Sequence, residues 1–370
     1  MPKYPQPDNK EQVYNKANSF TNIAGSVDYD RTLKRILHLH DNIENIQSNL
    51  RAVVKQACSD VLVKSGSRDR MFTLQKMVLA EIDQVEDKNL ARYLNYRYRY
   101  DINPQNQKID NFPPCVQIEP TSICNYRCVF CYQTDKKLTQ GKHGHMGMMS
   151  IDLFKNIIDQ IEGNVEAVTL ASRGEPLMAK SIIPMLMYAS NKFLAFKVNT
   201  NASFLNEEKI HTLLSAEPNT LVFSADAADN ALYAKLRVNG DLDKVVSNIK
   251  LFSQIRQKHY PKNKTIVRVS GVRYSEEQHF EDIEKFWRQY TDQVAFVSYN
   301  PWESAYDSQP NNITDHCSDL WRRTFIWWNG TINPCDVDYR STLAVGNANT
   351  ESITDVWKGT NYSNLRNLHS

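Results

Sequence analysis

The sequence has almost no surplus of charge, because 44 Lys and Arg residues face 42 Asp and Glu residues, a net charge of +2 at pH 7. A surface that binds nucleic acid usually requires a basic excess, so the composition gives no support to a nucleic-acid partner. No stretch reaches the roughly 18 apolar residues of a membrane-spanning helix. The first ten residues also lack the apolar core of a secretory signal. We therefore expect a cytoplasmic protein with no membrane partner.

Cysteine is scarce, with 7 residues in a chain of 370, which excludes a disulfide-based fold. The length predicts two or three domains. Three of the cysteines lie within eight residues of one another, at Cys124, Cys128 and Cys131. In a reducing compartment such a cluster indicates metal or redox chemistry. Cys58 and Cys115 stand apart from it, and we expect both to be structural.

The pattern of apolar and polar residues changes twice along the chain and predicts three regions. Apolar residues recur at helical spacing between residues 28 and 98, and a polar, proline-containing linker follows at 103–114. We therefore predict a helical N-terminal extension with its linker at 1–110, a central domain at 111–305, and a small C-terminal segment at 306–370.

The central region alternates short apolar strands with amphipathic helices, which is typical of parallel βα units. Such units form an open sheet or a partial barrel, with the chemistry at the C-terminal ends of the strands. Ser150 and Asn206 are predicted to cap two of the helices, and another helix is predicted at 276–290. The six predicted strands are Cys115–Glu119, Ala167–Ala171, Phe193–Thr200, Thr220–Ser224, Thr265–Gly271 and Gln293–Ser298.

The cysteine cluster follows the first predicted strand, with gaps of three and two residues between its members. Three thiolates would leave one iron of a four-iron cluster open, and that position could bind a substrate or cofactor. The alternative is a zinc site, which needs a fourth ligand. Cys115, His143 and His145 are candidates for that ligand, at irregular distances along the chain.

The C-x₃-C-x₂-C spacing, with Phe130 before the last cysteine, resembles the radical S-adenosylmethionine (SAM) superfamily. The resemblance implies a partial (β/α)₆ barrel, a [4Fe–4S] cluster on Cys124, Cys128 and Cys131, and SAM on the open iron. It also implies that SAM is cleaved to a 5′-deoxyadenosyl radical, which abstracts hydrogen from a substrate. A flavodoxin or ferredoxin would supply the electron.

Further segments at the strand ends resemble those that contact SAM in this family. Ser172–Pro176 resembles the Gly-Gly-Glu-Pro segment, except that Arg173 replaces the first glycine, so the turn could differ because Arg disfavours positive φ. Phe130 and Tyr132 would flank the adenine. The full set of cofactor-binding residues implied by the resemblance is Phe130, Tyr132, Gly174, Glu175, Pro176, Asn199, Asn201, Ser224, Asp226 and Ser270.

The C-terminal segment resembles the start of a SPASM or twitch domain, which carries auxiliary iron–sulfur clusters. The matching pattern is Cys317-x₁₂-Gly330-x₄-Cys335, and the Asn329-Gly330 pair predicts a β-hairpin. No cysteine follows Cys335, so the segment resembles an incomplete version of that domain. Three readings stay open: a shortened version of a longer protein, a domain without a cluster, or an auxiliary cluster with an unusual ligand such as Asp336, Asp338 or His316.

The substrate is not fixed by any motif. The helical N-terminal region shows no hairpin for a winged-helix peptide-recognition domain, which favours a sugar or sugar-nucleotide substrate and a dehydrogenation or epimerisation. The alternative is a peptide, as in the maturation of ribosomally made peptides or of sulfatases. A third hypothesis is a protein without catalytic activity, either an iron–sulfur electron carrier or a zinc-binding protein. Such a protein does not need the segments at the strand ends that resemble SAM-binding segments.

Overall fold

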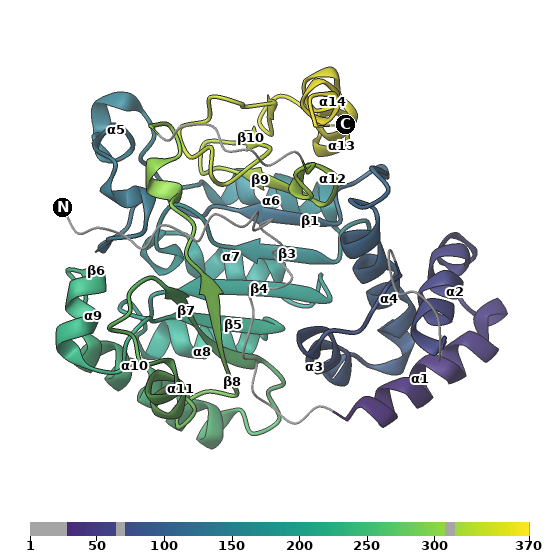
Figure 1. The fold of residues 1–370 in the computed structure, drawn as a ribbon, viewed down its shortest axis with the longest axis horizontal. Coiled ribbons are helices and arrows are strands. Elements are labelled where there is room, and N and C mark those ends of the chain that lie inside the picture. The colour runs from purple at the N-terminus through teal and green to yellow at the C-terminus, as the bar shows by residue number, and fades with distance from the viewer. Residues whose placement is uncertain (1–27, 64–70, 308–314, 370) are drawn as a thin grey trace.

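The computed structural model describes residues 28–63, 71–307 and 315–369. A twisted sheet forms the centre of the molecule, with helices on its outer side and a group of N-terminal helices at one end of its strands (Figure 1). Among the described residues, no helix combines the length and the apolar character needed to cross a bilayer.

The N-terminal region is helical, as the apolar periodicity predicted. Its helices bury a shared apolar cluster that includes Ile36, Val54 and Tyr93, and that reaches Cys115 and Ala167 at the starts of two central strands of the sheet. Cys58 is fully buried in this cluster. The helices are α1 (Tyr29–Asp41), α2 (Ser48–Leu62), α3 (Lys76–Gln84) and α4 (Asp87–Ile102).

Six parallel strands form the central domain, and they confirm the predicted βα series and the partial barrel. Each neighbouring pair is parallel and in the order in which the chain makes them. The strands are β1 (Cys115–Ile118), β3 (Ala167–Leu170), β4 (Ala195–Thr200), β5 (Thr220–Ser224), β7 (Ile266–Arg273) and β8 (Gln293–Ser298). The boundaries at residues 110 and 305 stay predictions.

The outer face of the sheet is apolar and packs against the helices that connect the strands. Ser150 and Asn206 cap α6 and α8, because their side chains accept hydrogen bonds from the amides of Leu153 and Lys209. The connecting helices are α6 (Ile151–Ile161), α7 (Ile182–Ala189), α8 (Glu207–Ala216), α9 (Asn230–Leu236), α10 (Leu242–His259) and α11 (Phe280–Trp287).

Helix α11 is shorter than the predicted 276–290. The carboxamide oxygen of Gln278 accepts hydrogen bonds from the amides of Tyr274 and Ser275, each at 2.8 Å. These bonds hold the preceding residues in a turn, so the helix begins only at Phe280. Side-chain competition of this kind is not visible in a periodicity of apolar residues.

The C-terminal segment extends the same sheet, which the sequence did not predict. Strand β9 pairs in parallel with β1, and β10 and β11 follow as antiparallel neighbours, giving nine strands. The predicted hairpin is confirmed, and Gly330 takes the positive φ of +86° that its turn requires. The elements are α12 (Asp319–Arg322), β9 (Arg323–Ile326), β10 (Thr331–Asn333), β11 (Gly346–Asn347), α13 (Ile353–Lys358) and α14 (Thr360–Asn367).

A buried ion pair joins this segment to the barrel. The Arg173 guanidinium donates to both oxygens of the Glu119 carboxylate at 2.7 and 2.6 Å, and both side chains are almost completely buried. Arg173 also donates to the carbonyl of Tyr339 at 2.9 Å and lies 4.4 Å from the ring of Trp327. The amide of Trp328 donates to Glu119 at 3.2 Å. Both partners therefore hold residues of the C-terminal segment.

We predict that Arg173→Gln destabilises the fold by about 3–5 kcal/mol, because it leaves the Glu119 carboxylate buried without its cation. The measurement is the free energy of unfolding in denaturant, with limited proteolysis to show whether the C-terminal segment is released first. Arg288→Gln is the matched control, because Arg288 pairs with Glu284 at the surface and such pairs contribute about 0–1 kcal/mol. Equal losses in the two variants would contradict the prediction.

Candidate functional site

The three clustered cysteines lie in one loop at the C-terminal end of β1. Backbone bonds hold this loop at both ends: the amide of Ser122 donates to Gly147, and that of Val129 donates to Leu236. Cys128 lies in the short strand β2 (Arg127–Cys128), which pairs with β6 (Arg237–Val238). None of the three thiols is in a disulfide.

The surroundings of these thiols are costly for a bare thiolate. Burial raises the pKa of Cys124 to about 12, and burial also raises the pKa of Cys128 and of Cys131. Binding to a metal centre replaces the proton with a cation, which offsets this cost. The donor set therefore fits a metal centre better than free redox-active thiolates.

Arg237 brings positive charge to the cysteine loop. Its Nη1 lies 3.7 Å from the Cys128 sulfur, and its Nε lies 2.5 Å from the Asp226 carboxylate. Asp226 is fully buried and also accepts a hydrogen bond from the amide of Val272. Asp226 therefore holds Arg237 in place against the cysteine loop. The contact between Asp226 and SAM that the family resemblance implied stays a prediction.

The Ser172–Pro176 segment packs directly against the cysteine loop. The amide of Glu175 donates to the carbonyl of Ile123 at 2.9 Å. A Cβ atom on Gly174 would lie 2.3 Å from the carbonyl oxygen of Thr121, so only glycine allows this approach. The unusual backbone angle falls on Ser172, with φ of +128°, and not on Arg173, whose side chain is used in the buried ion pair.

Glu175 joins this segment to the end of β4. Its carboxylate accepts hydrogen bonds from the Thr200 hydroxyl at 2.6 Å, the Asn201 amide at 2.7 Å and the Leu177 amide at 3.0 Å. Burial nevertheless raises the pKa of this carboxyl. Pro176 begins the short 3₁₀ turn that Glu175 caps. Glu175 therefore orients the ends of two neighbouring strands. Its carboxylate is already hydrogen-bonded to other residues of the protein.

Two residues that the sequence analysis missed complete the network. Asn125, between the first two cysteines, accepts from the Asn201 side chain at 2.9 Å and donates to the Ser203 hydroxyl at 3.1 Å. The Gln133 side chain donates to the carbonyls of Ser122 and Arg173. The only available signal was their place inside or beside the cysteine motif.

Several buried polar atoms around the loop have no hydrogen-bond partner within the described parts of the chain. They are the Oγ of Ser172, the Oδ1 of Asn199 and the Oε1 of Gln133. Buried polar atoms are normally satisfied, so such a group next to a set of thiols indicates a polar ligand. Ser224 and Ser270, which are paired in register on β5 and β7, are both partly exposed on the same side. The residues present fit a cluster that also binds SAM.

Comparison with protein families agrees with this geometry. Residues 118–290 match the model of the radical SAM superfamily, and residues 317–370 match that of SPASM, an iron–sulfur cluster-binding domain. The chain therefore contains a radical SAM domain and a SPASM domain. A radical SAM domain implies a [4Fe–4S] cluster and SAM as cofactors, and a SPASM domain implies auxiliary iron–sulfur clusters.

Curated relatives match over less than half of this chain. An uncharacterised protein of Methanocaldococcus jannaschii is 25% identical over 169 residues, which is 45% of this chain and 54% of the relative. The AdoMet-dependent heme synthase of Methanosarcina barkeri is 24% identical over 41% of each chain. The subtilosin biosynthesis protein AlbA of Bacillus subtilis is 22% identical over 46% of this chain and 38% of its own. The matches thus span about half of these relatives or less.

Solved structures show the same fold over more of the chain. Streptococcus suis SuiB bound to SAM has a TM-score of 0.54 at 16% identity, covering 92% of this chain and 84% of SuiB. The structure of anSMEcpe with bound AdoMet has a TM-score of 0.53 at 13% identity, covering 69% and 83%. At these identities the likeness establishes the fold alone.

The two predicted adenine-flanking aromatics of the radical SAM domain have different neighbours. Phe130 lies 5.5 Å from the ring of Tyr274, on the barrel side. Tyr132 is buried and lies 5.1 Å from the ring of Tyr339, in the SPASM domain. Contact of both rings with one adenine stays a prediction, and Phe130 is the more accessible of the two.

In the SPASM domain, Cys317 and Cys335 are partly exposed and not in a disulfide. Two of the proposed extra ligands have other roles. The Asp338 carboxylate accepts four hydrogen bonds from Tyr306, Thr342 and Leu343, and the His316 Nε2 lies 2.8 Å from the carbonyl of Pro104.

Asp336 is better placed than the other two candidates. It is buried, and its charge raises the pKa of Cys335, after burial itself as the largest cause. In the described ranges, the loop of Cys124, Cys128 and Cys131 included, no three His, Cys, Asp or Glu side chains lie close enough to bind one metal ion. An auxiliary cluster on Cys317 and Cys335 in this chain therefore stays a prediction.

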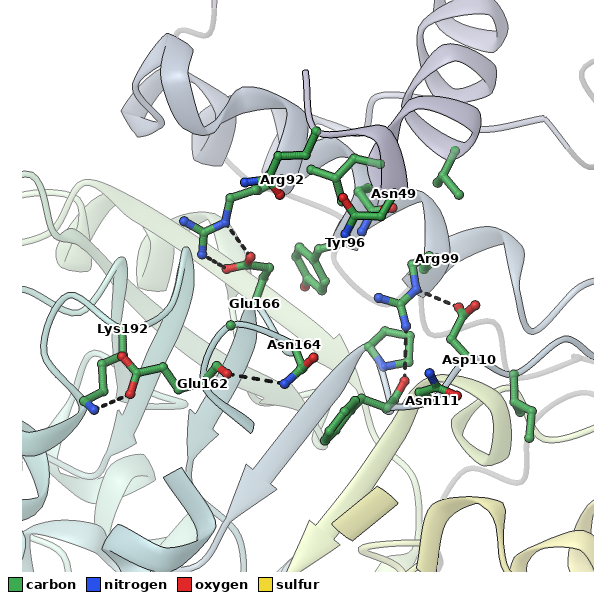
Figure 2. A pocket seen from close by; sticks show the side chains of 18 of the residues that line it. Asn49, Arg92, Tyr96, Arg99, Asp110, Asn111, Glu162, Asn164, Glu166 and Lys192 are labelled. Atoms are coloured by element: carbon green, nitrogen blue, oxygen red, sulfur yellow. Dashed lines mark hydrogen bonds and ion pairs between the residues drawn. The ribbon is translucent and has the colours of Figure 1, made fainter. Parts of the chain in front are cut away.

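A separate polar cleft of about 870 Å³ lies where the N-terminal helices meet the starts of the strands (Figure 2). Arg92 is paired there with Glu166 at 2.8 Å, and Arg99 with Asp110 at 2.6 Å. Glu166 directly precedes β3, whereas the cysteine loop follows the opposite ends of the strands. The cleft is therefore not part of the radical SAM site.

We predict that Gly174→Ala lowers the rate of SAM cleavage by on the order of a hundredfold, because its Cβ would displace the segment from the cysteine loop. The product 5′-deoxyadenosine is measured by chromatography, and the visible absorbance of the cluster is recorded in parallel. Gly141→Ala is the control, since a Cβ there meets no atom within 4 Å. A wild-type rate in Gly174→Ala would show that the close approach is not required.

Proposed function

We propose that this protein is a radical SAM enzyme whose first cluster is held by Cys124, Cys128 and Cys131. The observation that carries the proposal is the joining of this free-thiol loop to the ends of β3 and β4, where Ser172 and Asn199 carry polar atoms without a partner among the described residues. When bound, the cluster and SAM would supply a 5′-deoxyadenosyl radical that abstracts hydrogen from the substrate.

The protein's own residues would bind and orient these groups. Gly174 would present backbone polar groups to SAM, because its segment packs against the cysteine loop, whereas the Glu175 amide is already bonded to Ile123. Asn199, Ser224 and Ser270 would contact it with side-chain oxygens at successive strand ends. Arg237 would partly balance the negative charge of the thiolates, as its contact with Cys128 suggests.

We infer that the substrate is a peptide, in place of the sugar-type substrate favoured by the sequence alone. The support is the similarity to SuiB, which extends over 92% of this chain and so includes N-terminal residues outside the radical SAM match. SuiB has also been solved with its precursor peptide SuiA, and anSMEcpe with the Cp18Cys peptide. A sugar or sugar nucleotide is the second candidate for the substrate. The cytoplasmic location and a flavodoxin or ferredoxin as electron donor remain expectations.

We predict that Cys128→Ala abolishes formation of 5′-deoxyadenosine, because the first cluster loses one of three ligands. Cys317→Ala should retain at least part of the uncoupled SAM cleavage, since Cys317 lies in the SPASM domain. Both are measured on anaerobically reconstituted protein with a strong reductant, by chromatography of the products.

Two outcomes would contradict this assignment. A colourless, zinc-loaded wild-type protein without SAM cleavage would favour the non-catalytic metal-binding alternative. Complete loss of cleavage in Cys317→Ala alone would mean that the SPASM domain is essential to the first cluster or to folding.

A further inference from the structure

The inner face of the sheet is polar, in contrast to its apolar outer face. Alternate residues of the strands point inward, and the register sets Gln117 beside Thr169, Thr169 beside Lys197, and Lys197 beside Thr220. The outward-pointing neighbours Val168 and Val198 belong to the main apolar core. The interior of the barrel is therefore a surface for polar contacts.

Lys197 is the unusual member of this inner face. It is partly exposed, and within the residues that the structure describes its side chain forms no hydrogen bond and no ion pair. Burial is nevertheless the largest cause that lowers the pKa of its amine, to about 8. The register of β4 with its neighbours places the Lys197 side chain on the inner face of the sheet, where part of its surface stays accessible.

The charges around Lys197 are mostly positive. Arg323 of β9 and Arg268 of β7 both lower the pKa of the Lys197 amine, whereas Cys115 of β1 and Glu81 of α3 raise it. Arg323 donates to the Tyr100 hydroxyl at 2.5 Å, and Arg268 donates to the Gln293 carboxamide at 2.9 Å. Burial also lowers the pKa of Arg268 more than Glu81 raises it. This part of the interior favours an anion.

The position of Lys197 relates it to the cofactor site. It precedes Asn199 by two residues on the same face of β4, which places it about 7 Å deeper in the barrel than the strand ends. Helices α3 and α4 close the bottom of the barrel, since Met77 contacts Arg268 and Tyr100 contacts Arg323. A group bound at Lys197 would therefore lie beneath the site proposed for SAM.

We propose that Lys197 binds a carboxylate of the substrate inside the barrel, with Arg268 and Arg323 adding positive field. The inference rests on the proposed function, in which the substrate is a peptide, so the carboxylate belongs to an acidic side chain. The Lys197 amine is flanked in register by the neutral Thr169 and Thr220, and its one full charge matches a carboxylate. Binding there would hold the peptide at a fixed depth below the strand ends.

The test measures binding by calorimetry on anaerobic, cluster-loaded protein saturated with SAM. The probes are acetyl-glutamate amide, acetyl-glutamine amide and inorganic phosphate. We expect the glutamate probe to bind, the neutral glutamine probe not to bind, and the affinity to fall as the pH rises through about 8, where the Lys197 amine loses its charge. This pH profile needs no variant and so does not depend on how a variant folds.

Two variants at the same position sharpen the test. Lys197→Met should weaken binding of the glutamate probe by about tenfold or more, because it removes a charged hydrogen-bond donor. Lys197→Arg should keep the binding and remove its dependence on pH between 7 and about 9.5, because a guanidinium stays charged there.

Three results would overturn the proposal. Equal binding of the glutamate and glutamine probes, or none of either, would show that no carboxylate site exists. Preferred binding of phosphate would assign the site to another anion. A Lys197→Met variant with weaker affinity for SAM and unchanged affinity for the probe would assign the amine to SAM itself. Each outcome is independent of whether the wild-type protein cleaves SAM, which is the test of the proposed function.

Discussion

The buried pair of Arg173 and Glu119 is the contact on which the site and the C-terminal segment both depend. Two charges removed from water are stable together only when their remaining hydrogen bonds are also satisfied. Here the surplus donors and acceptors are met by Tyr339 and Trp328, both from the SPASM domain. The pair therefore couples the segment next to the cysteine loop to a domain that begins more than a hundred residues later in the chain.

The cysteine loop itself is placed by polar contacts and close backbone packing. Glu175 connects the ends of β3 and β4, Asn125 connects the loop to β4, and Arg237 connects it to β5 through Asp226. These contacts use most of the polar side chains near the loop. The oxygens of Ser172, Asn199 and Gln133 that have no partner in the described part of the chain therefore mark where a ligand is expected.

Much of this arrangement could be predicted from local sequence, but some of it could not. The six strands, the caps at Ser150 and Asn206 and the turn at Gly330 depend on periodicity and on single residues, and these predictions are confirmed. The pairing of β9 with β1 and the contact of Arg237 with Cys128 join segments far apart in the chain.

Candidate ligands show the same limit. Asp338 and His316 are reasonable metal ligands by residue type, but both contact other parts of the protein. Asp226 matches a family motif, yet its carboxylate is paired with Arg237, which no motif marks. A motif identifies which residues have the right chemistry, whereas packing decides which of them are available.

The parallel pairing of β9 with β1 also has a consequence for synthesis of the chain. Until β9 emerges from the ribosome, the outer edge of β1 has backbone donors and acceptors without a strand partner, although the rest of the barrel is already made. An unpaired edge of this kind can pair with another chain, and distant contacts form slowly. The nascent barrel should therefore need protection from aggregation until its C-terminal residues are complete.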